Sequence, residues 1–219
     1  MKKALTIFFV ILIIAVCLIG WKYEQANNLI ITLGWKDGAV QEVYENDQLQ
    51  SRANYKNGEY DGNFKEYYEN GNLKGERNYC EGKINGIVKT YYESGELSSE
   101  NVWKDHMLNG VSRLYYKTGN LKSEINYKNH KKDGPVKVFL ESGESIQMNY
   151  KDGRIEGKAQ WFYKSGNLKS ETNYKNNKME GTLKAYYESG KIQKIETYQA
   201  DQLLSKKEYD EQGDLIKEE

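Results

Sequence analysis

A unit of about 24 residues recurs along most of this 219-residue chain. The glycines that start successive units follow one another at steps of 24, 24, 24, 24, 23 and 24 residues, and Ser205 stands in the same place 24 residues later. Such a fixed period is the signature of a repeat protein, in which neighbouring units stack on one another. The starting glycines are Gly38, Gly62, Gly86, Gly110, Gly134, Gly157 and Gly181.

Each unit reads as two strands. Its first half carries an aromatic pair followed three residues later by a second glycine, as at Tyr67-Tyr68 and Gly71. Its second half alternates with period two, which is typical of a strand. In the segment 168–174, alternation places Leu168, Ser170, Thr172 and Tyr174 on one face.

Turn signals separate the strands. Ser-Gly, Asn-Gly and Thr-Gly follow the aromatic pairs, and Asn57-Gly58 or Asp152-Gly153 follows the aromatic residue that closes a unit. Glycine supplies the positive φ that tight turns between twisted strands require. The sequence therefore predicts an all-β, elongated antiparallel β-meander of about seven 24-residue hairpin repeats over residues 38–219.

The two residues of each aromatic pair must face opposite sides of the sheet, because side chains alternate along a strand. The second residue shares its face with apolar side chains such as Phe64 and Val88, and the first shares its face with cations such as Lys65 and Lys89. Two interpretations of these rings stay open: they cover a thin sheet by stacking across strands, or they line a ligand groove. The candidate binding surface is the row of first aromatics, Tyr67, Tyr91, Tyr115, Phe139, Phe162 and Tyr186.

The N-terminal segment is apolar. Residues 4–20 contain only apolar or small side chains except Thr6, between Lys2-Lys3 and Lys22. A hydrophobic helix that anchors the chain in a membrane competes here with a cleaved signal peptide and with a buried helix. Valine before Cys17 disfavours lipidation of that residue. We predict an uncleaved anchor over residues 1–22, a linker with a lead-in strand over 23–37, and repeats outside the cytoplasm, or secreted after cleavage.

Charge and chemistry exclude several functional classes. Acidic and basic residues are equal in number, without the one-signed basic stripe that nucleic-acid binding requires. His106 and His130 occupy the same repeat position in turns, about two strands or 10 Å apart, which suits surface turn residues better than a shared metal ion. No nucleophile and base pattern or phosphate loop occurs. We expect no catalytic residues, cofactor or metal.

The unit resembles the MORN repeat variant, a short β-hairpin repeat with the pattern Gly, four residues, Tyr-Tyr, a glycine, a leucine and a closing Tyr before Asn-Gly or Asp-Gly. The resemblance covers residues 38 to about 216. It implies a role in interaction or scaffolding and transfers no catalytic residue. Bacterial proteins of this make are often labelled YwqK-type antitoxins, which implies neutralisation of a toxin.

The expected function is that of a membrane-anchored binding or scaffold module that presents an aromatic-rich surface to a protein or glycan. The alternative is an antitoxin or immunity protein. Exposed strand edges at the ends of a meander also allow self-association.

Overall fold

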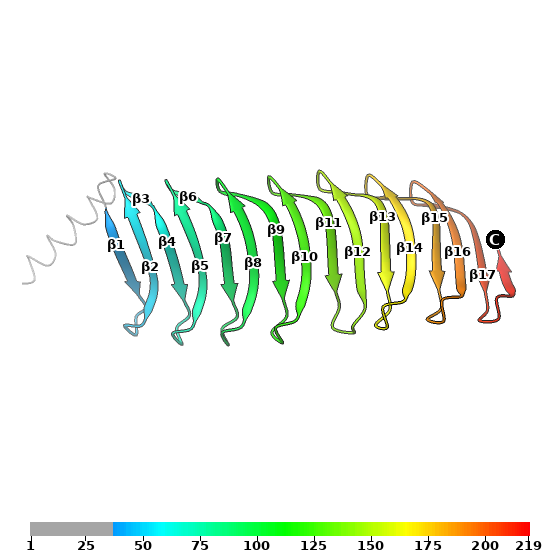
Figure 1. Ribbon diagram of the computed structural model, residues 1–219, viewed down its shortest axis with the longest axis horizontal. Helices are drawn as coiled ribbons and strands as arrows, with labels where there is room; N and C mark the ends of the chain where they lie inside the picture. Colours follow the sequence, from blue (N-terminus) through cyan, green and yellow to red (C-terminus); the bar gives the residue numbers. More distant parts are fainter. Residues whose placement is uncertain (1–36) are drawn as a thin grey trace, which may run out of the picture.

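A single antiparallel β-sheet makes up the described part of the protein, residues 37–219 of the computed structural model (Figure 1). Each strand pairs with the strand before it and the strand after it in sequence, so the chain forms a meander. Two strands are interrupted: β2 pairs with both β3 and β4, and β5 pairs with both β6 and β7. When each interrupted strand is counted once, the 18 strands of residues 37–219 form eight consecutive hairpins.

The strands are β1 (Gly38–Val43), β2 (Leu49–Lys56), β3 (Glu59–Tyr60), β4 (Gly62–Tyr67), β5 (Leu73–Cys80), β6 (Lys83–Ile84), β7 (Gly86–Tyr91), β8 (Leu97–Lys104), β9 (Met107–Tyr115), β10 (Leu121–Lys128), β11 (Lys131–Phe139), β12 (Ser145–Lys151), β13 (Arg154–Phe162), β14 (Leu168–Lys175), β15 (Lys178–Tyr186), β16 (Ile192–Gln199), β17 (Gln202–Tyr209) and β18 (Leu215–Glu218). The ribbon in Figure 1 shows the hairpins side by side along the long axis of the molecule.

This architecture confirms the predicted all-β meander of hairpin repeats. The final partial copy forms the eighth hairpin, and it is one residue shorter than Ser205 suggested, because Ser205 pairs with Thr197 as Thr182 does one copy earlier. The predicted anchor over 1–22 and the strand at 29–33 lie outside the described residues. Within residues 37–219 no helix is long and apolar enough to cross a bilayer.

The turns within each copy need the second glycine. In the copy that starts at Gly62, Gly71 N donates to Tyr68 O at 2.9 Å, and Tyr68 N donates to Asn72 O at 2.8 Å. Gly71 has a φ of 84°. This is the three-residue hairpin loop in which a residue in the left-handed region forms a bulge. The first copy uses Asp47 (φ 63°) at this place.

The turns between copies are two residues long, and both residues have positive φ. Examples are Asn57-Gly58 (52° and 79°) and Asn129-His130 (48° and 65°). This conformation is the type I′ turn, whose twist matches that of the flanking strands. The predicted turn positions of the two histidines are therefore confirmed.

Burial defines the two faces of the sheet. All nine residues of 37–219 that are classed as buried lie on one face, which we call the inner face: Ser51, Ala53, Phe64, Ser99, Ser112, Ser123, Val136, Thr172 and Glu196. No second layer covers this face in the described part, so its side chains bury one another. The opposite side is the outer face.

A β-bulge near the start of the second strand corrects the predicted face of one residue. Trp161 pairs with Ser170 on the inner face, whereas Phe162 pairs with Leu168. Lys169 is the extra residue between these two pairs. Because a bulge changes the alternation of side chains, Leu168 lies on the outer face, opposite Ser170, Thr172 and Tyr174.

Candidate functional site

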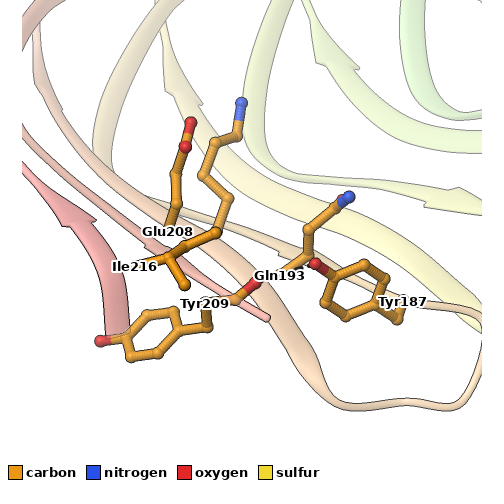
Figure 2. Close-up of a pocket in the computed structure, with 6 residues that line it drawn as sticks. Tyr187, Gln193, Glu208, Tyr209 and Ile216 are labelled. Carbon is orange, nitrogen blue, oxygen red and sulfur yellow. Dashed lines mark hydrogen bonds between the residues drawn. The ribbon is translucent and has the colours of Figure 1, made fainter. Parts of the chain in front are cut away.

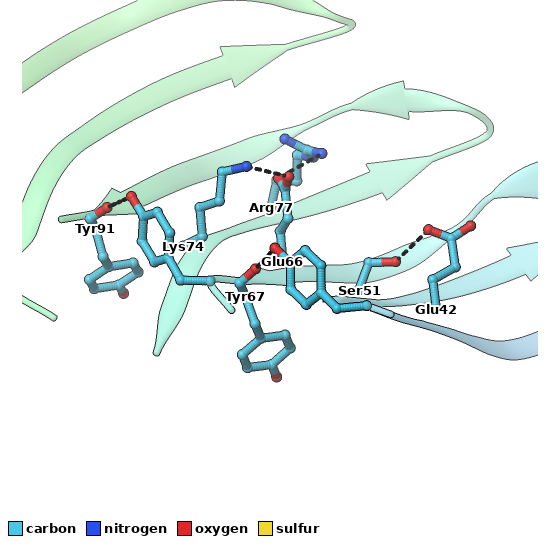
Figure 3. Close-up of polar contacts among 9 residues, drawn as sticks. Glu42, Ser51, Glu66, Tyr67, Lys74, Arg77 and Tyr91 are labelled. Carbon is cyan, nitrogen blue, oxygen red and sulfur yellow. Dashed lines mark hydrogen bonds and ion pairs between the residues drawn. The ribbon is translucent and has the colours of Figure 1, made fainter. Parts of the chain in front are cut away.

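The predicted aromatic row lies on the outer face beside the turns within each copy. Its six members, Tyr67, Tyr91, Tyr115, Phe139, Phe162 and Tyr186, are all half-buried. Most of them pair across the hairpin with a leucine or isoleucine, as Tyr67 does with Leu73. In Figure 3 the rings of Tyr67 and Tyr91 point to the same side, away from Glu66, Lys74 and Arg77. The structure thus brings the row together as a continuous stripe of rings and aliphatic side chains.

Two of these tyrosines contact carboxylates. The Tyr91 hydroxyl donates to Glu76 Oε1 at 3.1 Å, and the Tyr186 hydroxyl donates to Glu171 Oε1 at 3.3 Å. Burial raises the pKa of both phenols above the usual value, and the neighbouring carboxylates raise it further. Both hydroxyls are therefore protonated donors at neutral pH.

A row of charged side chains crosses the middle of the outer face. From Lys65 to Lys137 the paired residues of successive strands alternate in sign, and we call this row the charge ladder. Arg113 contacts Glu124 at 2.9 Å and Glu100 at 3.5 Å, and Glu76 lies 3.7 Å from Lys65. Sequence analysis placed the cations here but missed the acids between them. The ladder comprises Lys65, Glu76, Lys89, Glu100, Arg113, Glu124 and Lys137.

The second aromatic of each copy ties that copy to the next one. The Tyr68 hydroxyl donates to the main-chain carbonyl of Tyr91, 23 residues later, at 2.7 Å. Figure 3 shows the hydrogen bonds that end on the carbonyl oxygens of Tyr67 and Tyr91. We call these hydroxyl donors the tyrosine spine: Tyr44, Tyr68, Tyr92, Tyr116, Tyr163 and Tyr187.

Lysines at the bulge position cover several spine rings. Lys122 Nζ lies 5.3 Å from the centroid of the Tyr116 ring, and Lys169 Nζ lies 5.3 Å from that of Tyr163. These distances allow cation–π attraction, which adds to the hydrogen bond that each tyrosine makes. Ring, hydroxyl and bulge lysine therefore act as one unit of the repeat.

One copy, residues 134–156, lacks every part of this unit, and we call it the interrupted copy. Leu140 occupies the spine position and has no hydroxyl to donate. The β11–β12 pairing shows no register shift, so the bulge residue is absent, which accounts for the single 23-residue step. The charge ladder stops here as well, because Gln147 and Gln160 face each other where charged residues alternate elsewhere.

The inner face of the interrupted copy is apolar. One row of paired residues runs from Leu114 through Ser123, Val138 and Ile146 to Trp161. The side chains of Leu114 and Trp161 are each 37% exposed. The next row of the same face adds Ile125, Val136, Met148 and Ala159.

A depression of about 640 Å³ opens beside this copy, between two neighbouring turns. Tyr116, Leu121, Phe139 and Leu140 supply its apolar lining. It is larger than the depression at the C-terminal end, which measures about 310 Å³ and is lined by Tyr187, Lys194, Glu208 and Ile216 among others (Figure 2).

Asp210 ends the tyrosine spine at the C-terminal copy. It follows Tyr209, whose carbonyl accepts the hydrogen bond from Tyr187 at 2.8 Å. One oxygen of the Asp210 carboxylate accepts N–H groups from Gln212, Gly213 and Asp214, each at 2.9 Å. The last turn is thereby closed on itself and offers no hydroxyl to a further copy.

The histidines act as turn acceptors. His130 Nδ1 accepts the N–H of Leu108 at 3.3 Å, while the His130 main-chain N–H donates to Leu108 O at 2.9 Å. Asn177 makes the same pair of contacts with Ile155. Among residues 37–219 no group of three or more metal-ligating side chains occurs.

These observations define a class of protein: a single-layer β-hairpin repeat in which hydrogen bonds and ion pairs, more than a buried core, join the copies. Comparison with known families identifies it further. The chain belongs to the MORN repeat variant family, whose model matches six segments that cover more than half of the chain: 36–57, 60–81, 84–105, 108–129, 155–176 and 179–200. No curated protein matches the chain significantly.

The family model passes over residues 130–154, which include most of the interrupted copy. Sequence analysis did not single out this copy. Two signals in the sequence mark it, namely the 23-residue step and the leucine in place of a spine tyrosine. A MORN repeat β-meander suggests a repeat-based binding or scaffold module.

Proposed function

We propose that the protein is a membrane-anchored binding module, held by residues 4–20, whose β-repeat surface engages a protein or glycan outside the cytoplasm. The proposal assigns the repeats no catalytic role. Its membrane attachment follows from the apolar N-terminal segment of the sequence.

The observation that carries the proposal is the aromatic stripe of the outer face. Tyrosine combines a large contact area with a polar group and loses little conformational entropy on binding. Six rings recur here at one ring per copy, about 10 Å apart. A stripe of this regularity suits an extended partner that makes repeated contacts.

Affinity capture tests the proposal. Full-length protein in detergent is immobilised and exposed to solubilised envelope components and to envelope glycans, and bound material is identified by mass spectrometry. A double variant, Tyr91→Ala with Tyr115→Ala, removes two adjacent rings and serves as the comparison. We expect specific capture by the wild type that the variant reduces.

Failure to capture any envelope component contradicts the proposal. The alternative, an antitoxin or immunity protein, makes a different genetic prediction. Deletion of the gene is then toxic unless a neighbouring gene is also deleted, whereas a harmless deletion removes that alternative.

A further inference from the structure

We propose that the inner face of the interrupted copy is a docking site for an amphipathic α-helix of a partner protein, with acidic residues beside its apolar face. The inference rests on the proposed function and deepens it, because it names one site and one kind of partner.

The argument begins with the coincidence of changes in one copy. The spine hydroxyl, the bulge residue and the charge ladder all depart from the pattern at Leu140, at β12 and at Gln147–Gln160. Each loss removes a contact between copies without a compensating one. In a chain whose other copies satisfy the same local rules, such a departure is where a functional site is expected.

The patch has the composition of a protein-binding surface. Leu114, Val138, Ile146 and Trp161 form its first row, and Trp161 is the kind of partly exposed aromatic residue that dominates binding energy at interfaces. The indole of Trp161 is held in place, because its Nε1 donates to Glu144 Oε2 at 3.1 Å and Lys169 Nζ lies 4.8 Å from its ring. A fixed ring loses little entropy when a partner binds.

The geometry favours a helix over a strand. Strands β9 to β13 are each paired along both edges, so their main chain offers no free edge to which an extended peptide could add. A helix satisfies its own main-chain hydrogen bonds and docks through side chains. The row from Leu114 to Trp161 crosses five strands, about 19 Å. A helix of about 13 residues spans that length.

Charge selects an acidic partner. Lys132 pairs with Tyr127 on the inner face and lies 4.9 Å from the Tyr150 ring, and Lys122 stands over Tyr116 beside the patch. Neither lysine forms an ion pair with a described residue. Lys169 is neutralised by Glu144 at 2.6 Å. Two unpaired cations therefore flank the patch, and they complement carboxylates beside the apolar face of a helix.

The test uses two synthetic helical peptides of about 18 residues, which exceed the length of the patch. Both carry the same leucine and tryptophan face, and they differ only in the flanking residues, glutamate in one and lysine in the other. Binding to the full-length protein in detergent is measured by fluorescence anisotropy. Variants are Trp161→Ala, Ile146→Ser and the double change Lys122→Glu with Lys132→Glu. The control is Ile87→Ser, which removes an exposed apolar side chain from the outer face.

We expect the acidic peptide to bind at least about ten-fold more tightly than the basic one, and Trp161→Ala to weaken it about ten-fold. Ile146→Ser weakens binding in the same direction, with circular dichroism confirming an intact sheet. The double lysine variant reverses the peptide preference, and Ile87→Ser changes nothing.

Absence of binding by either peptide, equal binding of both, or wild-type affinity in Ile146→Ser overturns the inference. The affinity capture distinguishes this failure from failure of the proposed function. A captured partner that is lost in Tyr91→Ala with Tyr115→Ala but retained in Trp161→Ala keeps the binding module and removes the inner-face site.

Discussion

The hydroxyl of Tyr68 lies 2.7 Å from the main-chain oxygen of Tyr91, the residue that begins the aromatic pair of the next copy. The same bond recurs between other copies, so each tyrosine closes the contact between one hairpin and its successor. Because each copy contacts only its neighbours, the stability of the array is close to a sum of such local terms.

Removal of one spine hydroxyl is therefore expected to weaken one junction. Tyr116→Phe leaves the Phe139 carbonyl without its 2.8 Å donor, and we predict a loss of about 1 kcal/mol in the free energy of unfolding. The measurement is urea denaturation followed by circular dichroism. Tyr115→Phe is the matched control, because the Tyr115 hydroxyl makes no hydrogen bond to a described residue. Equal losses in the two variants contradict the assignment.

Restoring the missing donor tests the interruption. In Leu140→Tyr the new hydroxyl can reach the Phe162 carbonyl, as Tyr163 reaches that of Tyr186 at 2.7 Å. We predict a gain of about 0.5–1 kcal/mol over Leu140→Phe, which adds the ring alone. If both substitutions change stability alike, the hydroxyl does not complete the spine.

The histidine turns give a prediction about chemistry in place of shape. His130→Ala removes the Nδ1 acceptor of the Leu108 N–H and leaves a β-carbon residue at a φ of 65°, so we expect a loss of about 1–2 kcal/mol. His130→Asn keeps an acceptor and tolerates this φ, as Asn177 does. Thermal melting of the two variants separates them, and an alanine variant as stable as the asparagine variant is the contrary result.

The charge ladder should respond to salt. Arg113→Met removes contacts with Glu100 and Glu124, and for half-exposed groups we predict a cost of about 0.2–1 kcal/mol at low salt. Screening shrinks that difference in 1 M NaCl, where the Debye length is about 3 Å. Lys137→Met is the control, since Lys137 forms no ion pair with a described residue. A cost that is independent of salt would sink the electrostatic explanation.

The outer tyrosines predict behaviour at alkaline pH. The folded-state pKa of Tyr91 and that of Tyr186 are raised by burial and by Glu76 and Glu171, respectively. A raised pKa means that the protonated phenol stabilises the fold below the unfolded-state value of about 10, and that this contribution is lost as pH rises through the folded-state value. Absorbance of tyrosinate during a pH titration should lose its late component in Tyr91→Phe with Tyr186→Phe. An unchanged titration curve argues against the two contacts.

The sequence predicted the repeat and its turns because these depend on local chemistry. Positive φ at Gly71 and at Asn57-Gly58 is a property of a few residues, and it recurs in every copy. The faces of residues between turns followed from simple alternation for Phe64 and Lys65. They failed at Leu168, because the bulge at Lys169 depends on pairing with another strand.

The ladders could not be read from one copy. Glu76 joins Lys65 and Lys89 only after the register between copies is fixed, and the Tyr68 bond ends on a carbonyl that no side-chain pattern reveals. The interrupted copy was visible as a short step at Gly134, but its meaning required knowing what the missing residue does elsewhere.

The most direct test of the account is site-specific photo-crosslinking of the full-length protein in living cells. A crosslinking amino acid is placed at Val138 on the inner face, at Tyr91 in the outer stripe and, as a control, at Glu211 in the last turn. We predict that the same partner is crosslinked reproducibly from Val138 or Tyr91, and that Glu211 captures none. No crosslinked partner from either face would contradict the claim that this sheet is a binding surface.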